Sequence, residues 1–303
     1  MMKQKLGYIG LGKMGFNMVE RLLDKGYEVV ACDTNVEALK NISILGAKPA
    51  GSLVSLVSLL SAPRLIWLMV PHQVVDSIIG GLSPFIQQAD TLIDGGNSPY
   101  KESMRRAREL GKRGINFLDA GVSGGPSGAR AGACIMVGGE KDVFEKYESL
   151  FRDLSAERGY GYMGKSGSGH FVKMVHNGIE YGMMQAIAEG FSIMKTSPFD
   201  LDLAKVAEIY NHRSVIESRL IGWLQKAFEQ YGEDLDSISG SVSHTGEGTW
   251  TVEAAKELGV PVPIIEGALN FRIQSQHNPS YTGQILSALR TQFGRHDVFK
   301  KNP

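Results

Sequence analysis

The chain has few cysteines, no net charge and no long hydrophobic run, and each shortage excludes a class of protein. Two cysteines among 303 residues, Cys32 and Cys134, cannot build a disulfide framework, and free thiols fit a reducing cytoplasm. The 32 basic residues balance 32 acidic ones, so no overall field draws the chain to nucleic acid or to an anionic membrane. The apolar run at 65–70 is far too short to span a bilayer. We therefore expect a cytoplasmic protein with no nucleic-acid or membrane partner.

Strand-like and helix-like patterns alternate through the first half of the chain. Apolar stretches typical of strands occur at 5–10, 28–33, 64–70, 91–96, 116–121 and 133–139. Near-continuous apolar runs of this kind indicate strands that are buried on both faces. The alternation predicts an α/β fold, in which a Rossmann-type, doubly wound parallel sheet covers residues 1–164.

From about residue 165 the strand pattern ends. Residues 168–195 contain no proline and predict one long helix, which is rich in small and apolar residues and so is expected to be buried on most sides. Further helical patterns occur at 201–211, 214–231, 251–258 and 263–275. These patterns predict that an all-α C-terminal domain covers residues 165–303.

The segment GYIGLGKMG carries three glycines in GxGxxG spacing, directly after the first predicted strand. The first glycine permits a tight turn, the second lets a pyrophosphate approach the backbone, and the third lets the helix pack on the strand. The N-terminus of the helix then offers free N–H groups to the phosphates. We predict a dinucleotide site whose contacts come from Gly10, Leu11, Gly12, Lys13, Met14 and Gly15. The alternative is a tight turn that binds no ligand.

Asp33 stands at the end of the second predicted strand. Its carboxylate can accept hydrogen bonds from the adenosine ribose hydroxyls, and it would repel the extra phosphate of NADP. No arginine follows it, because the next residues are Thr34, Asn35 and Val36. NAD is therefore favoured over NADP, and no metal is expected. The alternative for Asp33 is a solvated strand end or a cap for the following helix.

The segment KMVHNGIEYG at 173–182 gathers polar groups on one face of the predicted long helix. From Lys173 the steps to His176, Asn177 and Glu180 are three, four and seven residues, which is the spacing of a helix face. Taken singly, these residues could be a snorkelling lysine, a core histidine and a solvated carboxylate. Together on an otherwise apolar helix they indicate a functional site.

Two glycine-dense loops follow predicted strands, DGGNSPY at 94–100 and GVSGGPSGARAG at 121–132. In an open α/β sheet, loops at the carboxyl ends of strands line the ligand crevice. Each loop alone could be only a turn. In combination with the polar helix face, the two loops indicate a ligand site much more specifically than either loop does alone.

At this point the chain resembles the 6-phosphogluconate dehydrogenases, within the β-hydroxyacid dehydrogenase superfamily. The resemblance covers nearly the whole chain and rests on GLGKMG, DGGNS, VSGG, KMVHNGIEYGMMQ, GEGTWT and RTQFGRH. The modest length is similar to the short form of that enzyme, which often prefers NAD. The resemblance implies oxidative decarboxylation of 6-phospho-D-gluconate, a phosphorylated sugar acid, to D-ribulose 5-phosphate and CO2 in the pentose phosphate pathway.

The resemblance also implies roles for individual residues. Lys173 is the general base for the C3 hydroxyl, and Glu180 is the acid that protonates C1 of the enediol. Both roles need a pKa moved toward neutrality by a semi-buried environment. His176 and Asn177 complete the catalytic set and also hold the sugar. Further substrate contacts are implied for Asn97, Ser123, Gly124, Gly125, Tyr181 and Thr251. Cofactor contacts are implied for Val70, Pro71 and Asn97.

The expected phosphate site departs from the family pattern. Glu217 stands where an arginine is expected, so that Arg219 is taken as its replacement, and Thr249 stands where a basic residue is expected. The C-terminal ALRTQFGRH keeps an arginine and a histidine, Arg290 and His296, which in relatives reach the phosphate of a neighbouring subunit. This implies a homo-oligomer, a dimer or tetramer, whose helical domain is the interface. The alternative is a tail outside the site.

Two other functions stay open. A dehydrogenase of another β-hydroxyacid or aldonate, using NAD or NADP without obligatory decarboxylation, is favoured by the missing cation at position 249. A non-catalytic dinucleotide-binding sensor is the second alternative. The pair Lys173 and Glu180 argues against a sensor, which needs neither a base nor an acid.

Overall fold

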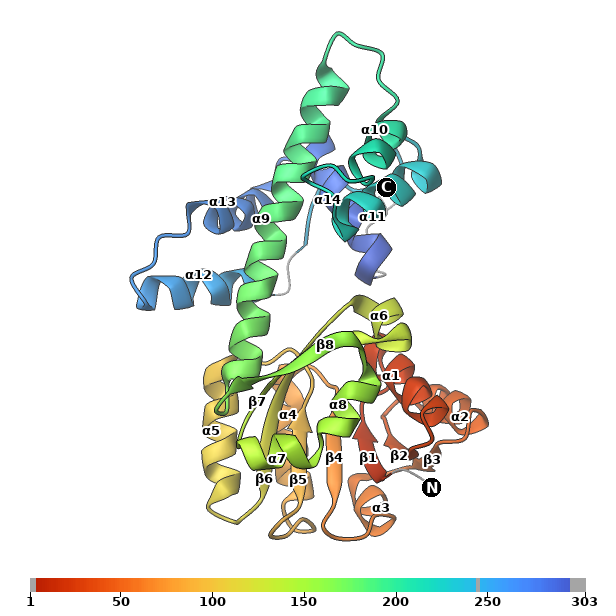
Figure 1. The fold of residues 1–303 in the computed structure, drawn as a ribbon, viewed down its shortest axis with the longest axis vertical. Coiled ribbons are helices and arrows are strands. Elements are labelled where there is room, and N and C mark those ends of the chain that lie inside the picture. The colour runs from red at the N-terminus through yellow and green to blue at the C-terminus, as the bar shows by residue number, and fades with distance from the viewer. Residues whose placement is uncertain (1–3, 244–245, 295–303) are drawn as a thin grey trace. The chain divides into compact units, whose positions relative to one another are not determined.

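The computed structural model describes residues 4–243 and 246–294. The chain divides into two compact units, residues 1–173 and residues 174–303. The N-terminal unit is built on one sheet, and the C-terminal unit is helical wherever it is described as regular structure (Figure 1). The predicted fold class, a Rossmann-type sheet followed by an all-α region, is confirmed.

The N-terminal unit contains an eight-stranded sheet. The strands are β1 (Lys5–Ile9), β2 (Glu28–Cys32), β3 (Lys48–Ala50), β4 (Leu65–Leu68), β5 (Thr91–Asp94), β6 (Asn116–Ser123), β7 (Ala133–Gly138) and β8 (Ser155–Gly164). Their order is β3-β2-β1-β4-β5-β6-β7-β8, and only the pair β6 and β7 is antiparallel. The first six strands therefore follow the 3-2-1-4-5-6 order of a dinucleotide-binding sheet.

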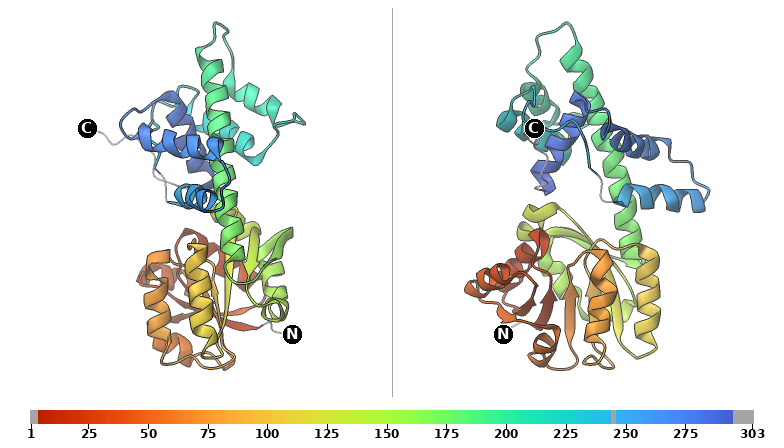
Figure 2. Two further views of the ribbon diagram at one scale, coloured as in Figure 1. Left: turned by 90° about the vertical axis from the view of Figure 1, so that its left-hand side faces the viewer. Right: turned by 180° about the vertical axis from the view of Figure 1, so that it is seen from behind.

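Helices cover both faces of this sheet (Figure 2). They are α1 (Lys13–Asp24), α2 (Val36–Ile44), α3 (Leu53–Ser58), α4 (His72–Leu82), α5 (Tyr100–Gly111), α6 (Gly125–Ala131), α7 (Lys141–Lys146) and α8 (Glu148–Leu154). Alternate residues of one strand enter two separate cores: Val29 packs with α1, α2, α7 and α8, whereas Val30 packs with α3, α4 and α5. Burial on both faces explains why the strands are apolar runs rather than alternating patterns.

The strand order reverses between β1 and β4. Sheets of this kind bind their ligands at such a switch point, outside the carboxyl ends of the strands. The loops that follow β1 and β4 lie against each other here, since a Cβ atom at Gly10 would lie 2.3 Å from the carbonyl oxygen of Met69. The topology therefore places the GxGxxG turn where a dinucleotide is expected.

The C-terminal unit is organised around the second part of a long helix. The helices are α9 (Ser168–Thr196), which begins in the N-terminal unit, then α10 (Leu203–Tyr210), α11 (Arg219–Tyr231), α12 (Glu247–Glu257), α13 (Pro263–Ser275) and α14 (Tyr281–Gly294). One core joins α9, α10, α11 and α14, with Phe191, Leu224 and Leu286 among its buried side chains. A smaller cluster joins α9, α12 and α13 around Tyr181.

Helix α9 leaves one strip of apolar side chains exposed. Ile179, Met183 and Ile193 have exposed fractions of 52%, 44% and 70%, and at about 100° per residue they share one side of the helix. Most other residues of the helix are buried or half-buried, as expected.

Candidate active site

The glycines of the turn after β1 meet different steric constraints. Gly10 has φ of +100°, and Gly15 packs so closely that a Cβ atom there would lie 2.0 Å from the carbonyl oxygen of Gly10. At Gly12, by contrast, nothing lies within 4 Å of the Cβ position. The turn itself therefore requires Gly10 and Gly15, whereas Gly12 opens onto free space that a ligand can approach.

The N-terminus of α1 suits an anion. Gly12 is its N-cap residue, no side chain caps the helix, and its first turn contains no acidic residue. The first N–H groups of a helix have no partner within the helix, and they carry a positive partial charge. Lys13 is exposed and Met14 is half-buried on this turn, while Leu11 is buried. A pyrophosphate group fits this arrangement.

Asp33 connects the end of β2 to the glycine turn. One carboxylate oxygen accepts a hydrogen bond from the Leu11 N–H, and the other accepts one from the Asn35 N–H at 2.7 Å. The cap of α2 is Asn35, whose side chain accepts from Glu37 and Ala38. Because a carboxylate has about four acceptor positions, Asp33 can still accept from ribose hydroxyls. The turn, the helix end and this half-buried carboxylate together fit a dinucleotide with an unphosphorylated ribose.

The loop after β5 lies directly against the end of β4. The Gly95 N–H donates to the Leu68 carbonyl at 2.8 Å, and a Cβ atom at Gly96 would lie 2.6 Å from the Val70 carbonyl oxygen. Asn97 is exposed in this loop, and Pro71 is exposed as the N-cap of α4. The two glycines therefore allow the segment bearing Asn97 to lie beside the segment bearing Val70 and Pro71.

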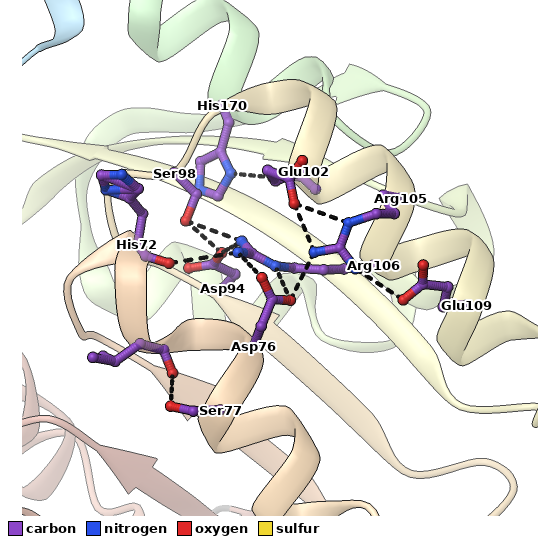
Figure 3. A network of polar contacts seen from close by, with 12 residues as sticks. His72, Asp76, Ser77, Asp94, Ser98, Glu102, Arg105, Arg106, Glu109 and His170 are labelled. Carbon is purple, nitrogen blue, oxygen red and sulfur yellow. Dashed lines mark hydrogen bonds and ion pairs between the residues drawn. The ribbon is translucent and has the colours of Figure 1, made fainter.

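A buried arginine, Arg106, connects α4, which follows β4, to the end of β5 (Figure 3). Arg106 is 3% exposed and binds both oxygens of Asp76 on α4 at 3.0 Å, and it contacts Asp94 at the end of β5 at 3.3 Å. The Ser98 hydroxyl donates to the same Asp94 at 2.7 Å. The hydrogen bond from Arg106 is the main cause that lowers the pKa of Asp76 to about 2. Helices α4 and α5 and the loop that carries Asn97 are therefore joined through one guanidinium group.

The loop after β6 lies beside the start of α9. β6 ends at Ser123, and Gly124 and Gly125 follow with φ of +128° and +63°, values that favour glycine. Ser123, Gly124 and Gly125 are half-buried. Two residues before Ser123, a Cβ atom at Gly121 would lie 2.3 Å from the Cβ atom of Lys173. Lys173 is half-buried and its stem rests on β6.

The polar face of α9 extends from Lys173 to Glu180 on a continuous helix. At about 100° per residue, Lys173, His176, Asn177 and Glu180 occupy roughly a 100° arc, and Lys173 and Glu180 are about 10 Å apart along the axis. His176 Nδ1 lies 3.1 Å from Asn177 Oδ1 and 3.9 Å from Glu180 Oε2. The His176 and Glu180 side chains are 37% and 26% exposed. These groups are thus neither core residues nor fully solvated.

Tyr181 is packed against a buried arginine that the sequence did not indicate. The Arg272 guanidinium lies 3.4 Å from the centre of the Tyr181 ring, and the two residues are 2% and 6% exposed. A Cβ atom at Gly248 would lie 2.6 Å from the ring, so this glycine leaves room for it. Burial lowers the pKa of Arg272 to about 10. Among the described residues no carboxylate lies within ion-pair distance of Arg272.

Arg290 is a second buried cation near this ring. It is 4% exposed, burial lowers its pKa, and its Nη1 donates to the carbonyl and hydroxyl oxygens of Ser243 at 2.6 and 2.7 Å. Burial is the main cause that raises the pKa of Tyr181; the charges of Arg272 and Arg290 oppose that rise, and those of Glu247 and Glu180 add to it. Two buried guanidinium groups therefore act on one tyrosine, and each is a cation that can donate hydrogen bonds to an anion.

The other predicted phosphate and substrate residues lie elsewhere or have structural contacts. Arg219 is exposed on α11 with its guanidinium 4.8 Å from the Trp223 ring, and it is not among the charged groups acting on Tyr181. Glu217 accepts a hydrogen bond from the Arg213 N–H. The Thr251 hydroxyl, which is buried, lies 2.8 Å from the Met174 carbonyl oxygen, and so links α12 to α9. His296 lies outside the described residues.

No group of three or more His, Cys, Asp or Glu side chains in residues 4–243 and 246–294 is arranged to hold a metal ion. No helix in the same residues is long and apolar enough to cross a membrane.

Family models match both parts of the chain. The model of the NAD binding domain of 6-phosphogluconate dehydrogenase matches residues 5–164, and that of the 6-phosphogluconate dehydrogenase C-terminal domain matches residues 169–299. Among similar proteins, YqeC of Bacillus subtilis, provisionally named a 6-phosphogluconate dehydrogenase, is 47% identical over 98% of this chain and 100% of its own length. The NAD(+)-dependent, decarboxylating 6-phosphogluconate dehydrogenase of Haloferax volcanii is 43% identical over 98% of this chain and 99% of its own.

A solved structure agrees with these matches. The 6-phosphogluconate dehydrogenase of Plasmodium falciparum, studied with NADP+ and with 6-phosphogluconate, superimposes with a TM-score of 0.83 at 31% identity. The match covers 90% of this chain but only 62% of the Plasmodium chain. This chain is thus similar to part of a longer enzyme and to the full length of shorter ones.

Proposed function

The chain belongs to the 6-phosphogluconate dehydrogenase family, and from this we propose that it converts 6-phospho-D-gluconate to D-ribulose 5-phosphate and CO2 with reduction of NAD. It is an NAD-dependent, decarboxylating dehydrogenase. The observation that supports the residue assignment best is the continuity of α9, which carries Lys173, Asn177 and Glu180 on one face. A base and an acid two helical turns apart can serve two successive proton transfers on one sugar acid.

The NAD site is formed by the turn after β1 and the end of β2. Backbone N–H groups of α1 hold the pyrophosphate beside Gly12, and Asp33 holds the adenosine ribose. A ribose 2′-phosphate would face the Asp33 carboxylate, and Thr34, Asn35 and Val36 provide no compensating cation. Val70, Pro71 and Asn97 lie on adjoining loops and serve the nicotinamide end. When bound, the cofactor supplies the hydride acceptor for C3 of the substrate.

Lys173 takes the proton of the C3 hydroxyl in the oxidation step. Its amine must be neutral to do so. As the proton passes to Nζ and the hydride leaves C3, a 3-keto acid forms. Its C3 carbonyl accepts the electron pair of the bond to the carboxylate carbon, Lys173 returns its proton to the C3 oxygen, and CO2 leaves as an enediol forms.

Glu180 then gives a proton to the carbon that lost CO2, which is C1 of the enediol, while Lys173 takes the proton of the neighbouring hydroxyl as the ketone forms. His176 lies between Lys173 and Glu180 on the same helix face and, with Asn177, holds the substrate hydroxyls or carboxylate. Ser123, Gly124 and Gly125 line the substrate from the loop after β6. Each of these groups either donates or accepts hydrogen bonds, as binding of a polyhydroxy acid requires.

Arg272 and Arg290 hold the phosphate, together with the Tyr181 hydroxyl. Burial lowers the pKa of both arginines although the charge of Glu180 opposes this, so an anionic ligand that reaches these groups offsets part of the cost of burying them. They take the place of the cations missing at Glu217 and Thr249. Arg219, which the sequence suggested, remains the alternative and is tested below.

We further propose that the chain forms a homo-oligomer, a dimer or tetramer, in the cytoplasm. The exposed apolar strip on α9, Ile179, Met183 and Ile193, supports an interface there, because monomers rarely expose such a continuous apolar surface. The contribution of His296 from a neighbouring subunit is part of this proposal.

The experiment that tests the proposed function is a comparison of initial rates. Purified protein is assayed with 6-phosphogluconate, gluconate and a small β-hydroxyacid, each with NAD or NADP. The fastest turnover is expected with 6-phosphogluconate and NAD. Preference for the small acid would favour the simple dehydrogenase, and binding of NAD without any turnover would favour the sensor.

A further inference from the structure

A buried carboxylate on β6 holds the first turn of α9. Asp119 is 0% exposed; its Oδ1 accepts from the Gly167 N–H at 2.6 Å and its Oδ2 from the His170 N–H at 2.9 Å. Among the described residues no lysine, arginine or histidine side chain pairs with it. A buried carboxylate needs compensation, and here the free N–H groups and positive dipole end of a long helix supply it.

Glycines let the helix approach the sheet at backbone distance. A Cβ atom at Gly169 would lie 2.5 Å from the carbonyl oxygens of Asp119 and Met136, and one at Gly138 would lie 2.7 Å from the Gly169 nitrogen. No side chain separates α9 from β6 and β7 at this point. The position of the first turn is therefore fixed by backbone contacts and by the two hydrogen bonds to Asp119.

Lys173 follows one turn later and meets the next residue on the same face of β6. Two strand residues span about 6.6 Å and one helical turn about 5.4 Å, so Gly121 comes beneath Lys173 when Asp119 lies at the helix start. A Cβ atom at Gly121 would lie 2.3 Å from Lys173 Cβ and 3.0 Å from its Cγ. Carbon atoms in contact lie about 3.5–4.0 Å apart, so an added methyl group must push the lysine stem away.

We propose that Asp119 and Gly121 are positioning residues for Lys173. Asp119 fixes the start of α9, and Gly121 lets the lysine stem lie flat on β6, so that together they set the depth and direction of Nζ. This inference rests on the proposed function insofar as Lys173 is the base. A displacement of about 1 Å at a reacting group can cost roughly 10²-fold in rate. Residues that fix the position of the Lys173 amine therefore affect turnover directly.

The kinetic experiment compares Gly121→Ala and Asp119→Ala with a control that is sterically strained elsewhere. Gly7→Ala on β1 is that control, since its Cβ would lie 2.9 Å from the side-chain ends of Leu56 and Leu60. We expect both test variants to lose at least about tenfold in kcat per folded protein, with the Kd for NAD changed less than about twofold. Gly7→Ala is expected to lose thermal stability while keeping its kcat.

Rescue and amide exchange separate positioning from general damage. Asp119→Asn keeps one acceptor oxygen, so its kcat is expected between those of wild type and Asp119→Ala. Hydrogen exchange at Gly167 and His170 should accelerate in Asp119→Ala but not in Gly7→Ala. Unchanged kcat per folded protein in both test variants, or unchanged exchange in Asp119→Ala, would overturn the inference.

A readout without turnover separates this inference from the proposed function. Lys173 Nζ is acylated with a small amine-reactive reagent, and the rate of its modification is measured by mass spectrometry. This rate should change in Gly121→Ala and Asp119→Ala but not in Gly7→Ala. If wild type fails to oxidise 6-phosphogluconate, the proposed function fails, and the labelling still decides whether these residues position Lys173. Equal labelling of all variants would contradict the inference.

Discussion

The Arg272 guanidinium lies 3.4 Å from the centre of the Tyr181 ring, and the charge of Arg290 also acts on Arg272. With its pKa lowered only to about 10 by burial, Arg272 stays charged at neutral pH. A ring face attracts a cation but does not neutralise it. The pair therefore keeps a buried positive charge available for an anionic group.

Replacing Arg272 tests whether this charge holds the substrate phosphate. A charged hydrogen bond contributes about 1.5–3 kcal/mol, so Arg272→Met should raise the KM for 6-phosphogluconate by roughly 10- to 150-fold. With gluconate, which has no phosphate, kcat/KM should change little. Arg219→Met is measured in parallel: if it alone shows the phosphate-dependent loss, the assignment belongs to Arg219. Arg272→Lys, which keeps the charge, should fall between wild type and Arg272→Met.

Arg290 is expected to act mainly on substrate binding. Arg290→Ala should raise the KM for 6-phosphogluconate by about tenfold or more and leave kcat within a few-fold. Ser243→Ala, which removes a hydroxyl partner of Arg290 but not the charge, serves as the matched control. An unchanged KM in Arg290→Ala would remove this arginine from the substrate site.

Lys173→Met is expected to abolish oxidation while leaving the cofactor site intact. Loss of a general base typically costs about 10²- to 10⁴-fold in kcat, whereas the Kd for NAD, measured by calorimetry, should stay within about twofold because no NAD contact is assigned to Lys173. Lys165→Met, at an exposed lysine shortly before α9, is the control and should behave like wild type. If Lys173→Met loses NAD binding as well, this lysine is structural.

Asp33→Asn tests the basis of the NAD preference. The amide keeps an acceptor for the Leu11 N–H but removes the negative charge that would face a 2′-phosphate. We expect kcat/KM with NAD to fall severalfold and kcat/KM with NADP to rise. The measurement is the ratio of the two values in wild type and variant; a ratio that does not move would assign the preference to other residues.

The hydrogen bonds of Arg106 predict that the stability of the folded chain decreases at low pH. The hydrogen bond from Arg106 lowers the pKa of Asp76 from 3.8 to about 2, so the ionised carboxylate is favoured in the folded state. This stabilisation is present above about pH 4 and is lost as the pH falls through about 2. Asp76 is half-exposed, and solvent screening keeps the effect modest.

The corresponding measurement is thermal unfolding at pH 6, 4 and 2.5. Asp76→Asn should be less stable than wild type at pH 6, and the difference should shrink toward pH 2.5. Glu253→Gln, at an exposed position of α12, is the matched control. A difference that stays constant with pH would exclude the ion pair as its cause.

The hydrophobic pattern predicted most strands of the sheet because they are apolar runs buried on both faces. It missed the two strands at the edges of the sheet, β3 (Lys48–Ala50) and β8 (Ser155–Gly164), in which most residues are half-buried or exposed, so no apolar run marks them. It also missed α14 (Tyr281–Gly294), which is buried around much of its circumference and shows little one-sided pattern. The helix expected from 214 begins at Arg219, because the Ser218 side chain caps it there.

The candidate site was predictable where its residues are neighbours in sequence. The polar face of α9 follows from helical spacing, and the GxGxxG turn follows from the steric requirements at Gly10 and Gly15 and from the open space at Gly12. Arg272 was not predictable in this way, because it meets Tyr181 only through the packing of α13 against α9. Arg219 was inferred from the family pattern as a replacement for the arginine expected at Glu217, and the fold instead places it against Trp223.

The most direct test of the central claim is the stoichiometry of two products in one reaction. Wild-type protein is incubated with 6-phosphogluconate and NAD, and NADH and CO2 are measured together over time. Oxidation by Lys173 followed by decarboxylation and protonation by Glu180 predicts one CO2 for each NADH. NADH without CO2, or no NADH at all, would contradict the account.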